Sequence, residues 1–108
     1  MHPLYYILDE NKQIRAATLE EWDESHSDPN RILARTKVGE CEVITAFLGY
    51  DDREMCGETI AGPPLVFGTI EYWKRQEKFR NEEFSASYDE ALKEHERRVA
   101  ALKAATVT

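Results

Sequence analysis

The chain has 108 residues, of which 42% are hydrophobic and 32% are charged, and its formal net charge is −7. This length and composition predict one compact acidic domain over residues 1–108 rather than a disordered chain. The negative charge argues against direct nucleic-acid binding through a broad basic face. No apolar run approaches the roughly 20 residues of a membrane helix, and the N-terminus lacks a signal-peptide pattern, so we expect a cytoplasmic protein.

A hairpin and a short helix are expected first along the chain. Residues 4–8 and 13–16 have strand composition and flank turn-forming residues. Thr18 and Glu21 have the spacing of a capping box, in which each side chain bonds the other residue's backbone N–H. The sequence therefore predicts a helix that starts after Thr18 and ends near Pro29.

Four more strands and a long helix are expected in the rest of the chain. The strands cover residues 31–38, 41–48, 64–73 and 79–84, and the second of them is apolar on both faces near its end, which indicates a central position. The fold class is therefore α+β, with element order β-β-α-β-β-β-β-α. We expect a single antiparallel sheet on which one short and one long helix pack.

The long helix is expected to begin with a second capping box, formed by Ser87 and Glu90. A stripe at helical spacing faces the sheet, whereas Arg98 is assigned to the opposite, solvent-facing side. The stripe consists of Tyr88, Ala91, Leu92, His95, Val99 and Leu102. Residues 49–62 show no period and are expected to form a mobile loop that folding does not require.

The acidic residues are concentrated in the first part of the chain. Residues 1–60 contain 13 acidic and six basic residues, whereas residues 61–108 contain eight of each. A surface of one sign attracts partners of the opposite sign, although net charge can also serve solubility alone. The candidate partner-binding residues are Glu20, Glu21, Asp23, Glu24, Asp28, Asp51, Asp52, Glu54 and Glu58.

Motifs for catalysis, phosphate binding or metal binding are absent from the sequence. His95 falls on the apolar stripe, Cys41 in a strand, and Cys56 in the loop without a nearby His or Lys to lower its pKa. Calcium would require a regular spacing of oxygen ligands that the acidic loop does not have. We therefore expect no enzyme, no cofactor and no metal site.

Several segments resemble, in the same order, a family of small proteins encoded by bacteriophages and prophages. They are residues 5–9, Leu19 with Trp22, residues 35–39, Val43, Thr45, residues 47–49, Asp51, residues 62–65, Phe67, Thr69, Glu90, Ala91 and His95. The relatives carry Asp-His and a short glycine-rich run where this chain has Asp51-Asp52 and a longer polar insertion. The resemblance implies a phage accessory protein and does not imply a reaction.

Protein binding is the expected function of such a domain. The leading hypothesis is an inhibitor of a host defence complex, similar to an anti-CRISPR protein, whose acidic face occupies a basic nucleic-acid-binding surface. Its partner would be a host protein complex with a basic surface, not nucleic acid or a membrane. The alternative is a self-associating phage structural or housekeeping protein with no host target, which leaves a homodimer open.

Overall fold

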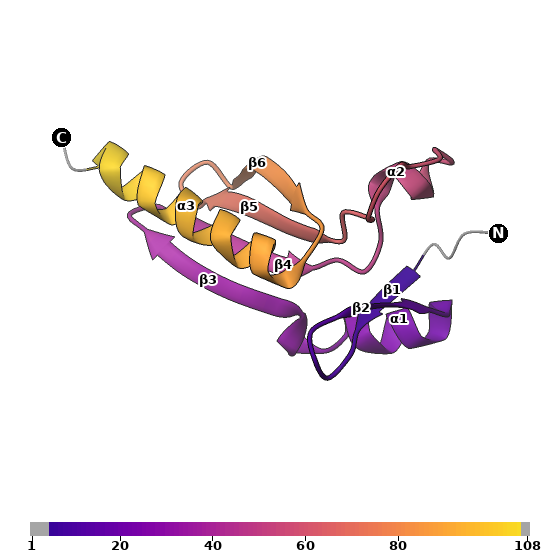
Figure 1. The fold of residues 1–108 in the computed structure, drawn as a ribbon. Coiled ribbons are helices and arrows are strands. Elements are labelled where there is room, and N and C mark those ends of the chain that lie inside the picture. The colour runs from indigo at the N-terminus through magenta and orange to yellow at the C-terminus, as the bar shows by residue number, and fades with distance from the viewer. Residues whose placement is uncertain (1–4, 107–108) are drawn as a thin grey trace.

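The structure is a computed structural model in which residues 5–106 are described. The chain folds as α+β and measures 51 × 27 × 25 Å along its principal axes, so it is elongated. The predicted fold class is confirmed, and Leu4 of the first expected strand lies outside the described residues. The elements divide between two ends of the long axis (Figure 1).

One end holds the N-terminal hairpin and the first helix. Strands β1 (Tyr5–Leu8) and β2 (Ile14–Ala17) form a two-stranded antiparallel sheet of their own, against which α1 (Leu19–His26) packs. A short 3-10 helix, η1 (Pro29–Arg31), follows. The expectation of a single sheet carrying both helices was therefore wrong, because among residues 5–106 the hairpin strands pair with each other and with no other strand.

The other end holds a four-stranded antiparallel sheet in the order β3-β4-β5-β6. Its strands are β3 (Ile32–Val38), β4 (Cys41–Phe47), β5 (Phe67–Trp73) and β6 (Lys78–Ser85). β4 and β5 occupy the centre, which confirms the central position that the apolar pattern of residues 41–48 predicted for β4. Between them the chain passes through a short helix, α2 (Asp52–Met55), at the hairpin end of the molecule (Figure 1).

Helix α3 (Tyr88–Thr106) covers one face of the four-stranded sheet. Ala91 and His95 of the expected stripe are buried, but Arg98 is buried beside them rather than facing solvent. The assignment of Arg98 to the solvent side was wrong because its guanidinium has ionic partners beneath the helix. The main apolar cluster joins α3 to the sheet and the hairpin, and consists of Phe47, Val66, Phe67 and Ala91 with Tyr6, Leu8, Ile14, Leu33 and Tyr88 packed against it.

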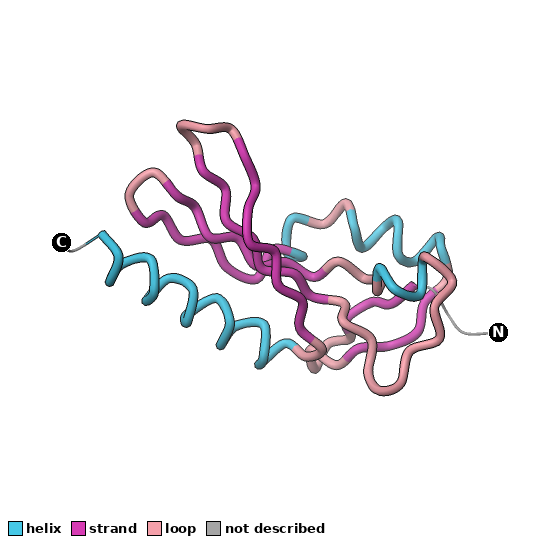
Figure 2. Tube along the Cα trace, turned by 90° about the horizontal axis from the view of Figure 1, so that it is seen from above, coloured by secondary structure: helices cyan, strands magenta, loops and turns pink. Residues whose placement is uncertain are grey.

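No described helix covers the opposite face of the sheet. Seen from above, α3 runs along one side of the strands, and α1 lies toward the other side at the hairpin end (Figure 2). Side chains alternate between faces along a strand. Because Thr45 and Glu71 contact α3, their neighbours Ile44, Ile70 and Tyr72 face away from it.

Candidate functional site

The first helix presents its carboxylates in two different roles. Thr18 and Glu21 form the predicted capping box, with N···O distances of 3.1 Å and 3.0 Å. The hydrogen bond from the Thr18 backbone N–H lowers the pKa of Glu21. Glu20, Asp23 and Glu24 are exposed and take part in no side-chain hydrogen bond or ion pair within residues 5–106. Their charge is therefore available to a partner.

A shallow groove of about 310 Å³ runs between α1 and β1. Glu21, Glu24 and Asp28 line it together with the apolar side chains of Ile7 and Leu8. The Asp28 carboxylate also caps η1 by accepting a hydrogen bond of 2.9 Å from a backbone N–H. Long basic side chains combine an apolar stem with a charged head. The groove offers complementary surfaces to both parts of a lysine or an arginine.

Trp22 fixes the position of the acidic helix. Its indole N–H donates to the Leu48 carbonyl at 2.9 Å, and its ring lies against Tyr5, His26 and Tyr50 with centroid separations of 5.2, 4.7 and 6.1 Å. These contacts tie α1 both to the hairpin and to the segment that leaves β4. The carboxylates of α1 therefore sit on a helix held by a large aromatic side chain.

Two of the candidate acids in the following segment are buried rather than exposed. Asp51, with 2% of its surface exposed, accepts hydrogen bonds from the Arg53 side chain and from the Leu65 backbone N–H, the shortest of them 2.7 Å. The bond from Arg53 is the main reason that the pKa of Asp51 falls to about 2. Asp51 therefore closes the loop between β4 and β5, and its proposed role in partner binding is corrected.

Glu54 is the second candidate partner-binding acid that the structure shows to be buried. It is 9% exposed and accepts a hydrogen bond of 2.8 Å from the Tyr6 hydroxyl of the hairpin. Burial and this carboxylate raise the pKa of Tyr6 to about 12. The carboxylate has a partner within the protein, so Glu54 links α2 to β1 and is not a contact for another molecule.

The segment 49–62 thus differs from the loop that the sequence predicted. It contains α2, and the buried polar contacts of Asp51 and Glu54 hold it together with the ring contact between Tyr50 and Trp22, whereas Met55 and Cys56 are exposed. We therefore expect its replacement by a glycine linker to destabilise the fold. Asp52 and Glu58 remain exposed, with no side-chain hydrogen bond or ion pair in the described part of the chain.

The fold collects the net charge at one end. We define the acidic end as residues 5–31 and 49–66, which contain α1, α2 and the hairpin and lie together in Figure 1. These residues include 11 acidic and four basic side chains, whereas the rest of the chain has ten of each. The whole net charge of −7 therefore belongs to the acidic end.

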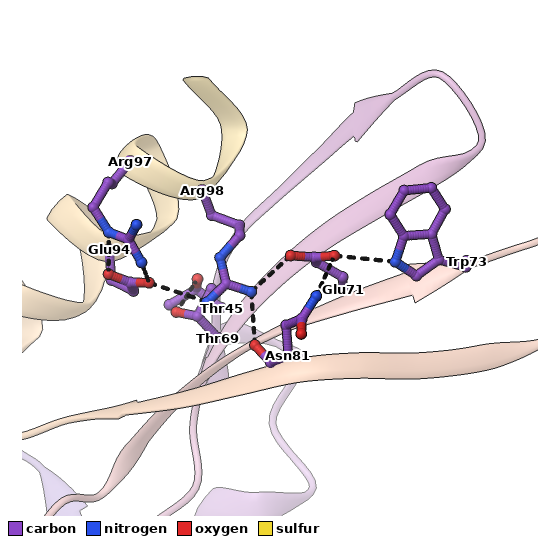
Figure 3. A network of polar contacts seen from close by, with 8 residues as sticks. All are labelled: Thr45, Thr69, Glu71, Trp73, Asn81, Glu94, Arg97 and Arg98. Atoms are coloured by element: carbon purple, nitrogen blue, oxygen red, sulfur yellow. Dashed lines mark hydrogen bonds and ion pairs between the residues drawn. The ribbon is translucent and has the colours of Figure 1, made fainter. Parts of the chain in front are cut away.

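A polar network that the sequence did not reveal lies beneath α3 (Figure 3). Arg98 donates to Glu71 at 2.8 Å and to the Asn81 carbonyl at 2.6 Å, and it also contacts Glu94. Burial alone would raise the pKa of Glu71, but hydrogen bonds from Arg98, Asn81 and Trp73 together lower it. The network joins α3, β5 and β6.

His95 lies in the same layer and hydrogen bonds two threonines. Its ring nitrogens are 2.8 Å from the Thr45 hydroxyl and 2.9 Å from that of Thr36, and Thr45 lies 2.8 Å from Thr69. Burial lowers the pKa of His95, which favours the neutral ring. Thr45 is fully buried, so the arrangement holds the helix on the sheet.

The remaining candidates for chemistry are separated from one another. Cys41 is buried, which raises the pKa of its thiol, and Cys56 is exposed. Over residues 5–106, no group of three His, Cys, Asp or Glu side chains is placed to hold a metal ion. None of the helices in this part of the chain is long and apolar enough to cross a membrane.

Comparisons with models of protein families, with curated proteins and with solved structures find no match. The acidic end, with its exposed carboxylates, is the feature of the structure that points to a binding function.

Proposed function

We propose that this protein is a phage-type accessory protein that binds a host protein complex through its acidic end. The target is a host defence complex in the cytoplasm, and inhibition is anti-CRISPR-like: the acidic end occupies a basic surface that otherwise holds nucleic acid. The observation that carries the proposal is the concentration of all net charge at one end, with unpaired carboxylates on α1.

Competition with nucleic acid follows from the chemistry of the groove. Lysine and arginine bind phosphate oxygens through charge-assisted hydrogen bonds, and carboxylates accept the same bonds. Glu24 offers a free carboxylate beside the apolar surface of Ile7 and Leu8. A basic side chain of the target can therefore place its stem and its charge in one groove, in competition with the phosphate backbone.

The test reverses the charge of two carboxylates that make no contact needed for folding. Asp23→Lys with Glu24→Lys changes two exposed carboxylates beyond the first turn of α1, so neither the capping box nor the cap of η1 is altered. Glu82→Lys with Glu83→Lys on exposed β6 is the matched control, because it makes the same charge change outside the acidic end. Asp28 is left intact because it caps η1.

The measurement is DNA binding by purified CRISPR effector complexes, followed with a fluorescent target duplex at increasing concentrations of each variant. The parent and the control should inhibit DNA binding, and the Asp23/Glu24 variant should require at least tenfold more protein, which is about 1.4 kcal/mol. Inhibition should weaken as salt rises. Equal inhibition by the two variants, or no inhibition by the parent, would contradict the proposal.

The second candidate function is self-association as a phage structural or housekeeping protein without a host target. The observation in its favour is the uncovered sheet face, where Phe79 is 61% and Phe84 is 37% exposed. A protein of this kind would remain associated in salt that releases a charge-dependent target, because apolar contacts are not screened.

A further inference from the structure

The uncovered face of the four-stranded sheet carries an apolar strip. Ile44, Ile70 and Tyr72 are half-buried on this face, and the Phe79 ring lies 4.9 Å from that of Tyr72. Phe84 pairs with Gly68 in the register and extends the strip across β6. In a sheet with one solvated face, that face is normally polar. A contiguous apolar strip there indicates a surface that another molecule covers.

Three lysines at the far end of the same sheet have no ionic partner among the described residues. Lys37 and Lys74 line a groove of about 520 Å³ with Tyr72, and Lys78 pairs with Trp73 at the start of β6. Of the acids in this region, Glu42 accepts from Arg35 at 2.7 Å and Glu40 lies 3.0 Å from Arg75, which leaves Glu77, exposed in the turn before β6, to offset the three lysines. Among residues 5–106, no ion pair involves these lysines. The far end therefore has positive charge available.

We propose that a second copy of this chain covers the strip, in a two-fold dimer whose long axes run in opposite directions. Charge fixes this orientation. In opposite directions, the free lysines of each copy approach the acidic end of the other, whereas parallel axes would bring lysines against lysines. A two-fold arrangement is also self-complementary and closed.

The size of the face supports the same orientation. Four strands about 4.8 Å apart with seven residues at about 3.3 Å each cover roughly 400 Å². A standard interface buries about 800 Å² on each partner, so the sheet face alone is about half of what is needed. Contact between the lysine end of one copy and the acidic end of the other supplies additional area.

Pairing through the free edge of β6 is less favourable. The register with β5 shifts between Thr69 and Glu71, and Asn81 at this bulge has a left-handed φ of 56°. Bulges and charged side chains on an edge strand oppose the addition of another strand. The face of the sheet, rather than its edge, is therefore the proposed contact.

The first test is sedimentation velocity of the purified protein from about 5 to 500 µM, a range that brackets a weak dimer. The parent should form a concentration-dependent dimer, and Phe79→Glu should raise its dissociation constant at least tenfold. Ala100 is exposed on α3, on the other side of the sheet from the strip. Ala100→Glu adds the same charge there and should leave the dissociation constant unchanged. A parent that stays monomeric, or a Phe79→Glu variant that associates like the parent, would overturn the proposal.

The orientation is tested by zero-length cross-linking of carboxylates to lysines in a mixture of ¹⁴N- and ¹⁵N-labelled protein. Links between copies should join Lys37 or Lys74 to the acidic end. A dimer whose links instead join these lysines to Glu40 or Glu77, which lie at the same end of the sheet as the lysines, would refute the opposed axes. Neither test includes a host target, and Phe79→Glu keeps the acidic end intact, so this dimer and the proposed function fail separately.

Discussion

Replacing Arg98 by methionine should lower the free energy of unfolding by about 3–5 kcal/mol, the range for breaking a buried ion pair by removing one partner. The side chains of Arg98 and Glu71 are 8% and 5% exposed, so Glu71 would keep its charge without its cationic partner. The Asn81 carbonyl would lose a donor as well. Methionine preserves much of the length of the side chain, so the loss reports the polar contacts rather than a cavity.

Arg97→Met is the matched control on the same helix. Arg97 pairs with Glu94, as Arg98 does, but its side chain is 62% exposed, so its removal should cost less than about 1 kcal/mol. Adding Glu71→Gln to Arg98→Met removes both charges and keeps an oxygen acceptor for Trp73. The double variant should lose less than the sum of the two single variants.

Urea unfolding followed by tryptophan fluorescence and circular dichroism measures these differences. Because hydrogen bonds lower the pKa of Glu71, its contribution to stability is present above its unfolded value near 4.5 and is lost as pH falls below it. Arg98→Met should weaken this pH dependence. If Arg98→Met and Arg97→Met both stay within about 1 kcal/mol of the parent, the Arg98 network does not stabilise the packing of α3 and the reasoning fails.

Three other changes test individual contacts by the same measurement. Gly49→Ala should lower the free energy of unfolding by about 2 kcal/mol or more. The φ of Gly49 is +79°, and the added Cβ would collide with the indole nitrogen of Trp22. Gly57→Ala is the control and should cost less, because its φ is similar, at +87°, but the added Cβ meets open space. Tyr6→Phe removes the donor to Glu54 and should cost about 1–3 kcal/mol. Burial lowers the pKa of His95, so stability should fall as pH drops through about 6.5, and His95→Gln should reduce that fall.

Local patterns in the sequence predicted most of the elements. The capping box of Thr18 and Glu21 depends on residues three apart, and it placed the start of α1 correctly. The apolar pattern of residues 41–48 correctly predicted that β4 is central in the sheet. The separation of the hairpin into its own sheet could not be predicted, because strand composition does not say which strands pair.

The buried charges could not be predicted for a related reason. Arg98 reads as a surface residue on a helix, and its partner Glu71 lies 27 positions earlier in the sequence. Glu54 meets the Tyr6 hydroxyl across 48 positions. A charged side chain is nearly always exposed unless it is paired, and pairing at this separation depends on the tertiary fold. A sequence pattern confined to one segment contains no signal for it.

The structure separates the nine candidate acids by what they already bind. Four hold the fold together through hydrogen bonds, and they are Glu21, Asp28, Asp51 and Glu54. Five have no side-chain hydrogen bond or ion pair within residues 5–106, and they are Glu20, Asp23, Glu24, Asp52 and Glu58.

Stability and binding should therefore respond to different substitutions. Neutralising one of the four bonded acids should lower the free energy of unfolding by about 1–3 kcal/mol where the group is buried. Neutralising one of the five free acids should leave stability within about 0.5 kcal/mol, and on α1 it relieves repulsion between like charges. Target binding should show the reverse order, since only the free carboxylates can exchange water for a basic partner. If unfolding and binding measurements rank the nine variants alike, the acidic end acts through the fold and is not itself the contact surface.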